Sequence, residues 1–448
     1  MTMTDRFDDD DANDYDAYNS TMQDMFFHQM QMLEEEDELA VAAAGIVIYL
    51  DEEVRRMRNA RRARNRQYLL RADLLPNPRL DTPWQALYNH QNKRGFVTTM
   101  GLDPDTFQII LDSGFRDLWD STPIPRSDTN SGGIPRLSRC SLDAAGALGL
   151  ILHYLSSPML EVSLCEIFAL IPATVSRYIQ FSLSLLLQTL RRMPQSRVCY
   201  LTGSEFQEQN DLIVVRHPRL TGAFGSMDGL NLPVQVSADE DTENATYNGW
   251  LHAHFVSSVF VFAAEGTIIA CNLNAPGSWH DSRVAQPIYL KLQHRTPEGY
   301  YLVTDTAFPR GSNQIAGRIQ APLKQGSKLP EDEHARNRLL EFNRQLLSYR
   351  QTAEWGMRSL QGSFGRLRVP LSIHFESYRA EVLETITRLH NLRARCVGIN
   401  QIRTVYMPMW TEDEQFLLHI QNTLFSDVRK NDRVSRFHIS AVPVGEND

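Results

Sequence analysis

Apolar and polar positions follow two different rhythms along this chain. As far as about residue 215, apolar residues recur every three or four positions, a period that predicts helices. From Gly222 onward, runs of β-branched and aromatic residues predict strands in residues 222–236 and 254–275. Helical periods return at about residues 332–360 and 378–395. This order predicts an α/β fold class, in which an all-helical region precedes a mixed sheet flanked by helices.

The first helical stretch covers residues 81–120. A helix should begin at Asp103-Pro104, since aspartate caps a helix and proline suits its first turn. Residues 121–136 are rich in Ser, Thr, Pro and Gly, which predicts a loop. Three more helices are expected after this loop, at about residues 142–155, 160–170 and 172–190.

The last two of these helices are separated by a tight turn. A short helix, a turn and a second helix that begins with small polar residues are typical of a helix-turn-helix, whose second helix reads the major groove of DNA. Thr174, Ser176 and Arg177 would then be the DNA-binding residues. The alternative is an ordinary helical bundle of the same composition.

The strand region contains its own turn and cap signals. Glu265-Gly266 should connect two antiparallel strands. Ser278 is placed to cap a helix that begins at His280. Residues 300–304 predict a further short strand that ends at Asp305, and open α/β sheets bind their ligands at such carboxyl ends.

Charge divides the chain unevenly. Its net charge is −9, but residues 1–38 hold 13 acidic residues and a single base, Arg6. Self-repulsion should keep this leader disordered. The remaining 44 basic and 41 acidic residues make the body mildly basic. We therefore expect an acidic leader (1–38), an Arg-rich helical segment (39–75), a helical domain (76–215), an α/β domain (216–400) and a C-terminal tail (401–448).

Seven arginines lie within residues 55–66, in a segment where a helix is expected to begin near Leu39. One interpretation is a solvated helix face. The functional interpretations are a nuclear-import signal, which predicts a nuclear protein, or contacts with the DNA backbone.

Five cysteines are scattered without any C-x-x-C pair, which argues against a disulfide scaffold or a zinc module and indicates a reducing compartment. The longest apolar run, residues 39–50, is 12 residues long, whereas a membrane span needs about 20. No membrane span is therefore expected. The acidic start of the chain also disfavours a secretory signal.

Acidic residues at the ends of apolar elements are the main candidates for chemistry. Asp228 interrupts an apolar strand, Asp305 ends another, and Glu354 lies on the long helix. Three carboxylates on two strands and a facing helix could hold two Mg²⁺ ions about 4 Å apart, an arrangement for phosphodiester cleavage. Each acid also has a structural alternative. Asp228 could be a turn residue, Asp305 a loop acid, and Glu354 a helical ion-pair partner of Arg350 or Arg358.

Asp281 is a fourth candidate acid. It follows Ser278 by three residues, close to the spacing of a capping box, and an acid suits the first turn of a helix. His280 could bind a metal or a phosphate, but a lone histidine is more often structural, so it is left out of the catalytic set.

Several short segments of the α/β region carry a family resemblance, over roughly residues 222–393. They are Ser226-Met227-Asp228-Gly229, Tyr247-Asn248-Gly249-Trp250, Pro276-Gly277-Ser278-Trp279-His280-Asp281-Ser282, Thr304-Asp305-Thr306-Ala307-Phe308, Ala353-Glu354-Trp355-Gly356 and Leu389-His390-Asn391. In this order they resemble the DDE endonuclease domain of PIF/Harbinger-type transposases and of genes domesticated from them. Thr306-Ala307-Phe308 departs from the run that many members carry after the second aspartate.

The resemblance implies an RNase H-like fold and a metal-dependent nuclease. Asp228 and Asp305 match the two catalytic aspartates, Glu354 the glutamate, and Asp281 an additional acid with a supporting role. The implied cofactor is Mg²⁺ or Mn²⁺, two ions in all. The implied reaction is hydrolysis at a transposon end, followed by attack of the freed 3′ hydroxyl on target DNA.

The resemblance also implies partners. DNA would be the substrate, and such transposases often act with a separately encoded Myb-like DNA-binding protein; a homo-oligomer is possible as well. Two alternatives stay open: a domesticated, non-catalytic DNA-binding or adaptor protein that keeps the fold, and an RNase H-like nuclease that acts on RNA.

Overall fold

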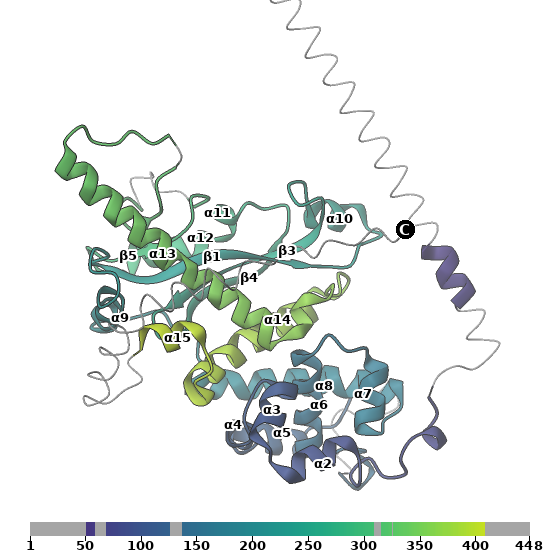
Figure 1. Ribbon diagram of the computed structural model, residues 1–448. Coiled ribbons are helices and arrows are strands. Elements are labelled where there is room, and N and C mark those ends of the chain that lie inside the picture. Colours follow the sequence, from purple (N-terminus) through teal and green to yellow (C-terminus); the bar gives the residue numbers. More distant parts are fainter. Residues whose placement is uncertain (1–50, 59–68, 126–136, 309–314, 325, 408–448) are drawn as a thin grey trace, which may run out of the picture. The chain divides into compact units, whose positions relative to one another are not determined.

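The computed structural model describes residues 51–58, 69–125, 137–308, 315–324 and 326–407 (Figure 1). The described residues fall into two units, divided at Arg71. In the first unit, residues 51–58 are helical, and Arg55 forms an exposed ion pair with Asp51 at 3.1 Å. Arg55, Arg56 and Arg58 are all exposed. The predicted leader, residues 1–38, and residues 408–448 of the predicted tail lie outside the described residues.

The second unit begins with helices, as the sequence predicts. They are α2 (Pro83–His90), α3 (Lys93–Met100), α4 (Pro104–Ile110), α5 (Arg116–Ser121), α6 (Ala144–Ser156), α7 (Glu161–Phe168), α8 (Pro172–Arg192) and α9 (Glu205–Val214). The predicted start at Asp103-Pro104 is confirmed, since Asp103 Oδ1 accepts the Thr106 N–H at 3.0 Å. Trp84 is fully buried, and a Cβ at Gly149 would lie 2.3 Å from its ring, so α6 needs glycine there.

Helices α7 and α8 are joined by three residues and cross at 95°. Their bend falls in the range of helix-turn-helix units, although the geometry by itself does not show a DNA-binding domain. Among the described residues no single helix has the length and apolarity to cross a membrane, and this bent pair meets that test by length and composition only.

The strands form one mixed sheet. They are β1 (Ala223–Pro233), β2 (Tyr247–Asn248), β3 (Ala253–Ala263), β4 (Ile268–Pro276), β5 (Tyr301–Val303) and β6 (Ile319–Gln320). Their order is β2-β3-β1-β5-β6, with β4 also paired to β3. The first strands are antiparallel, whereas β5 and β6 continue the sheet in parallel with β1. The predicted hairpin is confirmed, and Gly266 in its turn has a φ of +84°.

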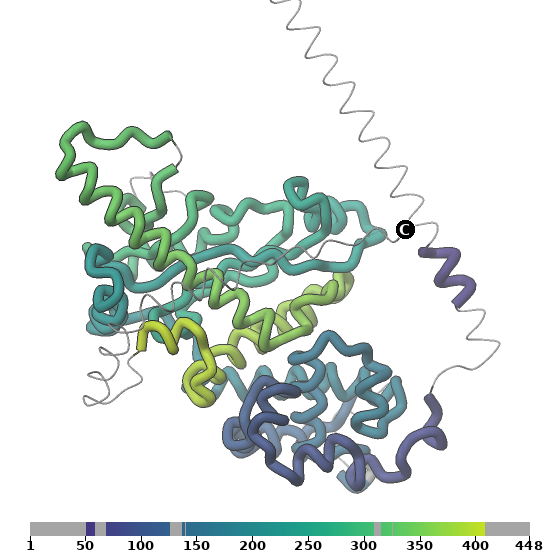
Figure 2. The backbone as a smooth tube through the Cα atoms, viewed as in Figure 1, coloured from purple at the N-terminus to yellow at the C-terminus, as the bar shows by residue number. Residues whose placement is uncertain are grey.

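Helices cover both faces of this sheet (Figures 1 and 2). They are α10 (Glu240–Thr246), α11 (Asp281–Val284), α12 (Gln286–His294), α13 (Glu333–Ser363), α14 (Glu376–Leu392) and α15 (Gln401–Tyr406). On one face, Met227 of β1 and Val261 of β3 pack in a core with Ile288 of α12. On the other face, α13 approaches so closely that a Cβ at Gly356 would lie 2.5 Å from the Phe262 ring.

This architecture confirms the predicted α/β class, a mixed sheet flanked by helices after a helical region. Two short strands, β2 and β6, and the acidic helix α10 were not predicted, because two-residue strands leave no periodic signal. Helix α15 extends the packed domain beyond residue 400: Tyr406 is buried and its hydroxyl contacts His217 Nε2 at 2.9 Å.

Candidate active site

Two of the candidate acids lie at equivalent levels of neighbouring strands, Asp228 within β1 and Asp305 just after β5. Strands β1 and β5 are parallel, and Ser226 pairs with Val303. Asp228 lies two residues after Ser226, and Asp305 lies two residues after Val303. Equal offsets from a paired position bring both acids to the same level of adjacent strands, so the strand register accounts for their proximity.

The environment of Asp228 is electrostatically unfavourable for its charge. Burial raises the pKa of Asp228 to about 6, and the negative charges of Asp305 and Asp281 act in the same direction. The Gly229 N–H, which donates to Asp228 Oδ1 at 2.8 Å, and the positive charge of Arg350 act in the opposite direction. The carboxyl is thus held among like charges at the middle of a core strand.

Asp281 reaches β1 from α11. Its carboxylate lies against the Gly229 backbone, where an added Cβ would be 2.6–2.7 Å from the carboxyl atoms of Asp281. Burial raises the pKa of Asp281, and the charge of Asp305 raises it further. Gly229 is therefore required by this close approach, a role that no sequence pattern indicates.

The predicted cap of this helix is wrong. His280, and not Ser278, is the N-cap of α11, since His280 Nδ1 accepts the Ser282 N–H at 3.3 Å. The helix starts at Asp281, one residue later than expected, so Ser278 lies too far upstream to reach the free N–H groups of its first turn. Asp281 is left free of capping and points to β1 instead.

Glu354 is engaged by an arginine. Arg350 Nη2 donates to Glu354 Oε1 at 3.1 Å, one helical turn away on α13. This is the ion pair that the sequence offered as the alternative to a catalytic glutamate. The same α13 is fixed on β1 by the Thr352 hydroxyl, which donates to Ser226 Oγ at 2.6 Å. Because Arg350 also acts on the charge of Asp228, it lies between the helix acid and the strand acid.

A divalent cation was tested against this arrangement. Carboxylate oxygens are the ligands that Mg²⁺ prefers, and neighbouring acids help to raise the pKa values of Asp228 and Asp281, so the donor chemistry fits. In the part of the chain that the structure describes, however, no three His, Cys, Asp or Glu side chains converge as metal ligands. Successive strand positions face opposite sides of a sheet. Asp228 faces α13, whereas Asp281 occupies the side-chain position of Gly229 on the other face.

The residues predicted to read DNA lie at the start of α8. Thr174, Ser176 and Arg177 are all partly buried. The Ser176 hydroxyl donates to Glu161 Oε2 of α7 at 2.9 Å, so it braces the two helices. DNA reading by these residues stays a prediction.

One segment of the chain, which contains the candidate acids, matches a known protein family. Residues 227–391 match the family model of the DDE superfamily endonuclease. This match confirms the resemblance at the level of a DDE endonuclease domain, which suggests a transposase-like nuclease. It begins one residue before Asp228 and ends at Asn391, so it includes Asp281, Asp305 and Glu354. No curated protein and no solved structure gives a significant match to the chain.

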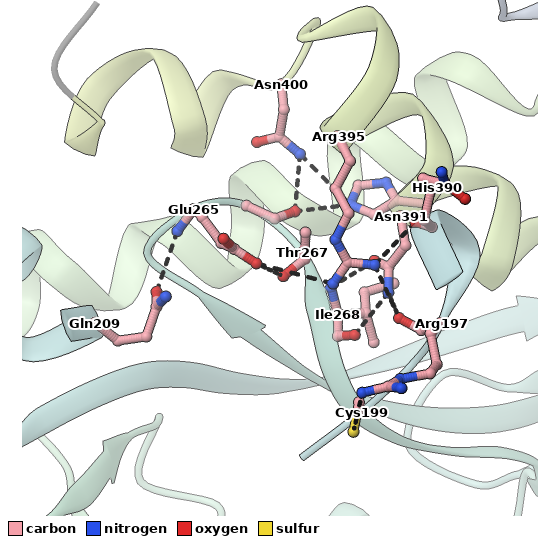
Figure 3. A network of polar contacts seen from close by, with 12 residues as sticks. Arg197, Cys199, Gln209, Glu265, Thr267, Ile268, His390, Asn391, Arg395 and Asn400 are labelled. Atoms are coloured by element: carbon pink, nitrogen blue, oxygen red, sulfur yellow. Dashed lines mark hydrogen bonds and ion pairs between the residues drawn. The ribbon is translucent and has the colours of Figure 1, made fainter. Parts of the chain in front are cut away.

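The last motif inside the DDE endonuclease match serves a structural role (Figure 3). Asn391 Oδ1 accepts the Ile268 N–H at 2.7 Å, and its Nδ2 donates to the carbonyls of Ile268 and Arg197 at 2.8 and 2.9 Å. Next to it, His390 Nε2 and Asn400 Nδ2 lie 3.1 and 2.9 Å from the Gly266 carbonyl. The family resemblance included Leu389-His390-Asn391 but indicated no role for them. In the structure, His390 and Asn391 of this motif fasten α14 to the β3–β4 turn.

Proposed function

We propose that this chain is a DNA endonuclease of the transposase type, in the PIF/Harbinger group, with an RNase H-like catalytic domain. The observation that carries the proposal is the position of Asp228 and Asp305 at one level of adjacent parallel strands, inside the segment that matches the DDE superfamily endonuclease. The strand order, with three antiparallel strands continued by two parallel ones, supports it.

In this proposal Asp228, Asp305 and Glu354 hold two divalent ions, Mg²⁺ or Mn²⁺, and Asp281 supports them. Such ions supply an activated water and stabilise the leaving oxygen in phosphodiester cleavage. The protein's own contribution is to fix two carboxylates on rigid strands and a third on α13. Arg350 balances charge next to these acids, because it bonds to Glu354 and acts on Asp228.

The proposed substrate is DNA at transposon ends and at the target. Thr174, Ser176 and Arg177 would contact it from α8, and the exposed arginines of residues 55–58 would contact its backbone or serve nuclear import. A nuclear location, a Myb-like partner and a homo-oligomer belong to the same proposal.

The test uses purified full-length protein and a DNA duplex that carries the element's terminal repeats. With Mg²⁺ or Mn²⁺ we expect nicking by the wild type and none by Asp228→Asn. Asp120→Asn is the matched control, because Asp120 is exposed on α5. Equal cleavage by the wild type and Asp228→Asn would refute the assignment. An RNA strand of the same sequence tests the alternative RNA substrate, which should remain uncut.

A second candidate function is a domesticated DNA-binding or adaptor protein without catalysis. The observation that favours it is the Arg350–Glu354 ion pair, which occupies the third acid. This candidate predicts that the wild type binds DNA but fails to nick it with either metal ion.

A further inference from the structure

A cavity among the described residues lies away from the candidate acids. Its volume is about 560 Å³, and it is lined by residues of α8, of the first turns of α14 and of the segment 366–372 that precedes α14. Gln235 also lines it, and the Gln235 N–H donates to the Leu371 carbonyl at 2.9 Å. The cavity therefore lies where the extended chain after β1 meets the segment between α13 and α14.

A buried cation without an acidic partner lines this cavity. Arg379 is only 6% exposed. Its Nε donates to Asn274 Oδ1, and its Nη1 donates to the carbonyls of Ser372 and Ile373 at 2.8 and 3.2 Å. Among the described residues no carboxylate forms an ion pair with Arg379, and its Nη2 has no hydrogen-bond partner. Burial of a cation is costly, and burial is the first cause of the lowered pKa of Arg379, while the charge of Glu376 acts in the opposite direction.

The start of α14 adds further unused donors. No side chain caps this helix at Phe375, so within the described structure the N–H groups of its first turn lack a capping acceptor. Phe375, Ser377 and Tyr378 of this turn line the cavity. The N-terminus of a long helix attracts anions through these N–H groups and through the helix dipole.

A second arginine faces the same space. The Arg366 guanidinium lies 3.9 Å from the centroid of the Tyr154 ring. In the described part of the chain no acid forms an ion pair with Arg366, and its Nη1 donates a long hydrogen bond of 3.5 Å to the Met159 carbonyl, so its other donors are available on the cavity wall.

Two carboxylates, Glu161 and Glu381, also line the cavity. Glu161 accepts the hydroxyl of Ser176, another lining residue, at 2.9 Å. Glu381 is next to the positive charge of Arg191, which lowers its pKa against the larger effect of burial. Neither glutamate forms an ion pair with Arg379 or Arg366 in the described part of the chain, so both guanidinium groups keep their charge for a ligand.

We propose that this cavity binds a phosphate group, with Arg379, Arg366 and the first turn of α14 as its ligands. Arginine is suited to phosphate because its planar fork binds two oxygens at once. The phosphate has two possible sources: a free phosphate ion or the backbone of DNA.

The DNA source rests on the proposed function. Gln235 lies seven residues after Asp228 and lines the cavity. A DNA strand cleaved at Asp228 would have to pass Gln235 for one of its backbone phosphates to enter the cavity.

The first experiment titrates inorganic phosphate into the full-length protein by calorimetry, against sodium chloride at equal ionic strength. We expect saturable binding by the wild type and about tenfold weaker binding by Arg366→Ala and by Arg379→Lys, since each loses a charge-assisted hydrogen bond. Arg368→Ala is the matched control, because Arg368 is exposed and does not line the cavity. If Arg379→Lys fails to fold, Arg366→Ala decides the outcome alone.

The second experiment identifies the source by fluorescence anisotropy with a DNA duplex at several salt concentrations. If DNA is the source, Arg366→Ala weakens DNA binding and lowers the salt slope by about one, and Arg368→Ala does not. Loss of phosphate binding with unchanged DNA binding indicates free phosphate. Equal behaviour of wild type and Arg366→Ala in both assays overturns the proposal. Cleavage by wild type and Asp228→Asn is measured separately, so failure of the nuclease assignment is recognised on its own.

Discussion

Two regions of the α/β domain carry family-type motifs, and they differ in how their polar groups are satisfied. Around Asp228, acids on β1, on α11 and after β5 act on one another through their charges, and the positive charges of Arg350 and His280 act on Asp228 and Asp281 respectively. Around Asn391, hydrogen bonds satisfy the polar groups except for His390 Nδ1: the amide bonds to both backbone groups of Ile268, and Asn400 shares the Gly266 carbonyl with His390 (Figure 3). The first region carries a negative charge that is not fully balanced, whereas the second joins α14 to the β3–β4 turn through uncharged hydrogen-bonding groups.

This difference distinguishes a network that stabilises the fold from the acids to which our proposal assigns catalysis. A satisfied network stabilises the fold, and its loss leaves buried groups without partners. A cluster of acids at raised pKa destabilises the fold and becomes useful only when a cation or a substrate arrives. The same family match covers both regions, so only their contacts distinguish them.

The largest effect is expected in the neutral region. Asn391→Ala should lower the free energy of unfolding by about 3 kcal/mol, because it removes three hydrogen bonds and leaves the buried Ile268 backbone groups unpaired. Denaturant unfolding of the full chain measures this. Asn337→Ala, at an exposed position of α13, is the control and should change stability by less than about 0.5 kcal/mol. Equal stability of the two variants would contradict the fastening role.

The acid region should respond in the opposite direction. Asp228 binds its proton more tightly in the folded than in the unfolded chain, so the folded state loses stability as the pH rises from about 4 through about 6. Asp228→Asn should therefore be more stable than the wild type at pH 7.5, by on the order of 2 kcal/mol, and equal to it near pH 4. Urea unfolding at both pH values measures this. Asp120→Asn should show no such pH-dependent gain, and a wild type more stable than Asp228→Asn at pH 7.5 would refute the account.

A smaller effect is expected at Gly229 of β1, where the Asp281 carboxylate lies against the backbone. Gly229→Ala places a Cβ against the Asp281 carboxylate and should cost about 1 kcal/mol of unfolding free energy. The double variant Gly229→Ala with Asp281→Ala should recover most of that loss, because the clash is then absent. A double-mutant cycle measures the coupling, and strictly additive effects would mean that the two residues do not touch.

The smallest effect concerns the start of α11. His280→Ala should cost about 0.5 kcal/mol through loss of the cap, and Ser278→Ala should be nearly neutral. Thermal unfolding of both variants at neutral pH compares them. A larger loss of stability from Ser278→Ala than from His280→Ala would support Ser278 as the cap, as the sequence predicted.

The sequence predicted most of this fold because its long elements have clear periods. Asp103-Pro104 marked the start of α4, and Glu265-Gly266 marked the hairpin turn that fixes the β3–β4 register. The cap of α11 was predicted wrongly because Ser278 and His280 are both near the start of the helix. Which of them caps it depends on the residue at which the backbone enters the helix. Gly277, just before Ser278, packs so closely on β3 that an added Cβ would lie 2.2 Å from the Phe255 carbonyl oxygen.

The candidate site was predictable in part. Asp228 could be placed within an apolar strand and Asp305 at the end of another by their neighbours, and the possible ion pair of Glu354 with Arg350 followed from a spacing of four residues. The opposite faces of Asp228 and Asp281 could not be foreseen, since that depends on the pairing of distant strands. Arg379 gave no signal either, because a lone arginine in a helix reveals neither its burial nor its lack of an acid.

The hydrogen bonds of Asn391 also protect an edge of the sheet from pairing with another copy of the chain. Strand β4 pairs with β3 alone among the described strands, so it lies at the edge of the sheet. Exposed backbone groups on such an edge invite another chain to add a strand, which is a route to aggregation. At Ile268 the Asn391 amide takes the place of that strand by using both the N–H and the carbonyl. One side chain thus blocks the beginning of an intermolecular sheet.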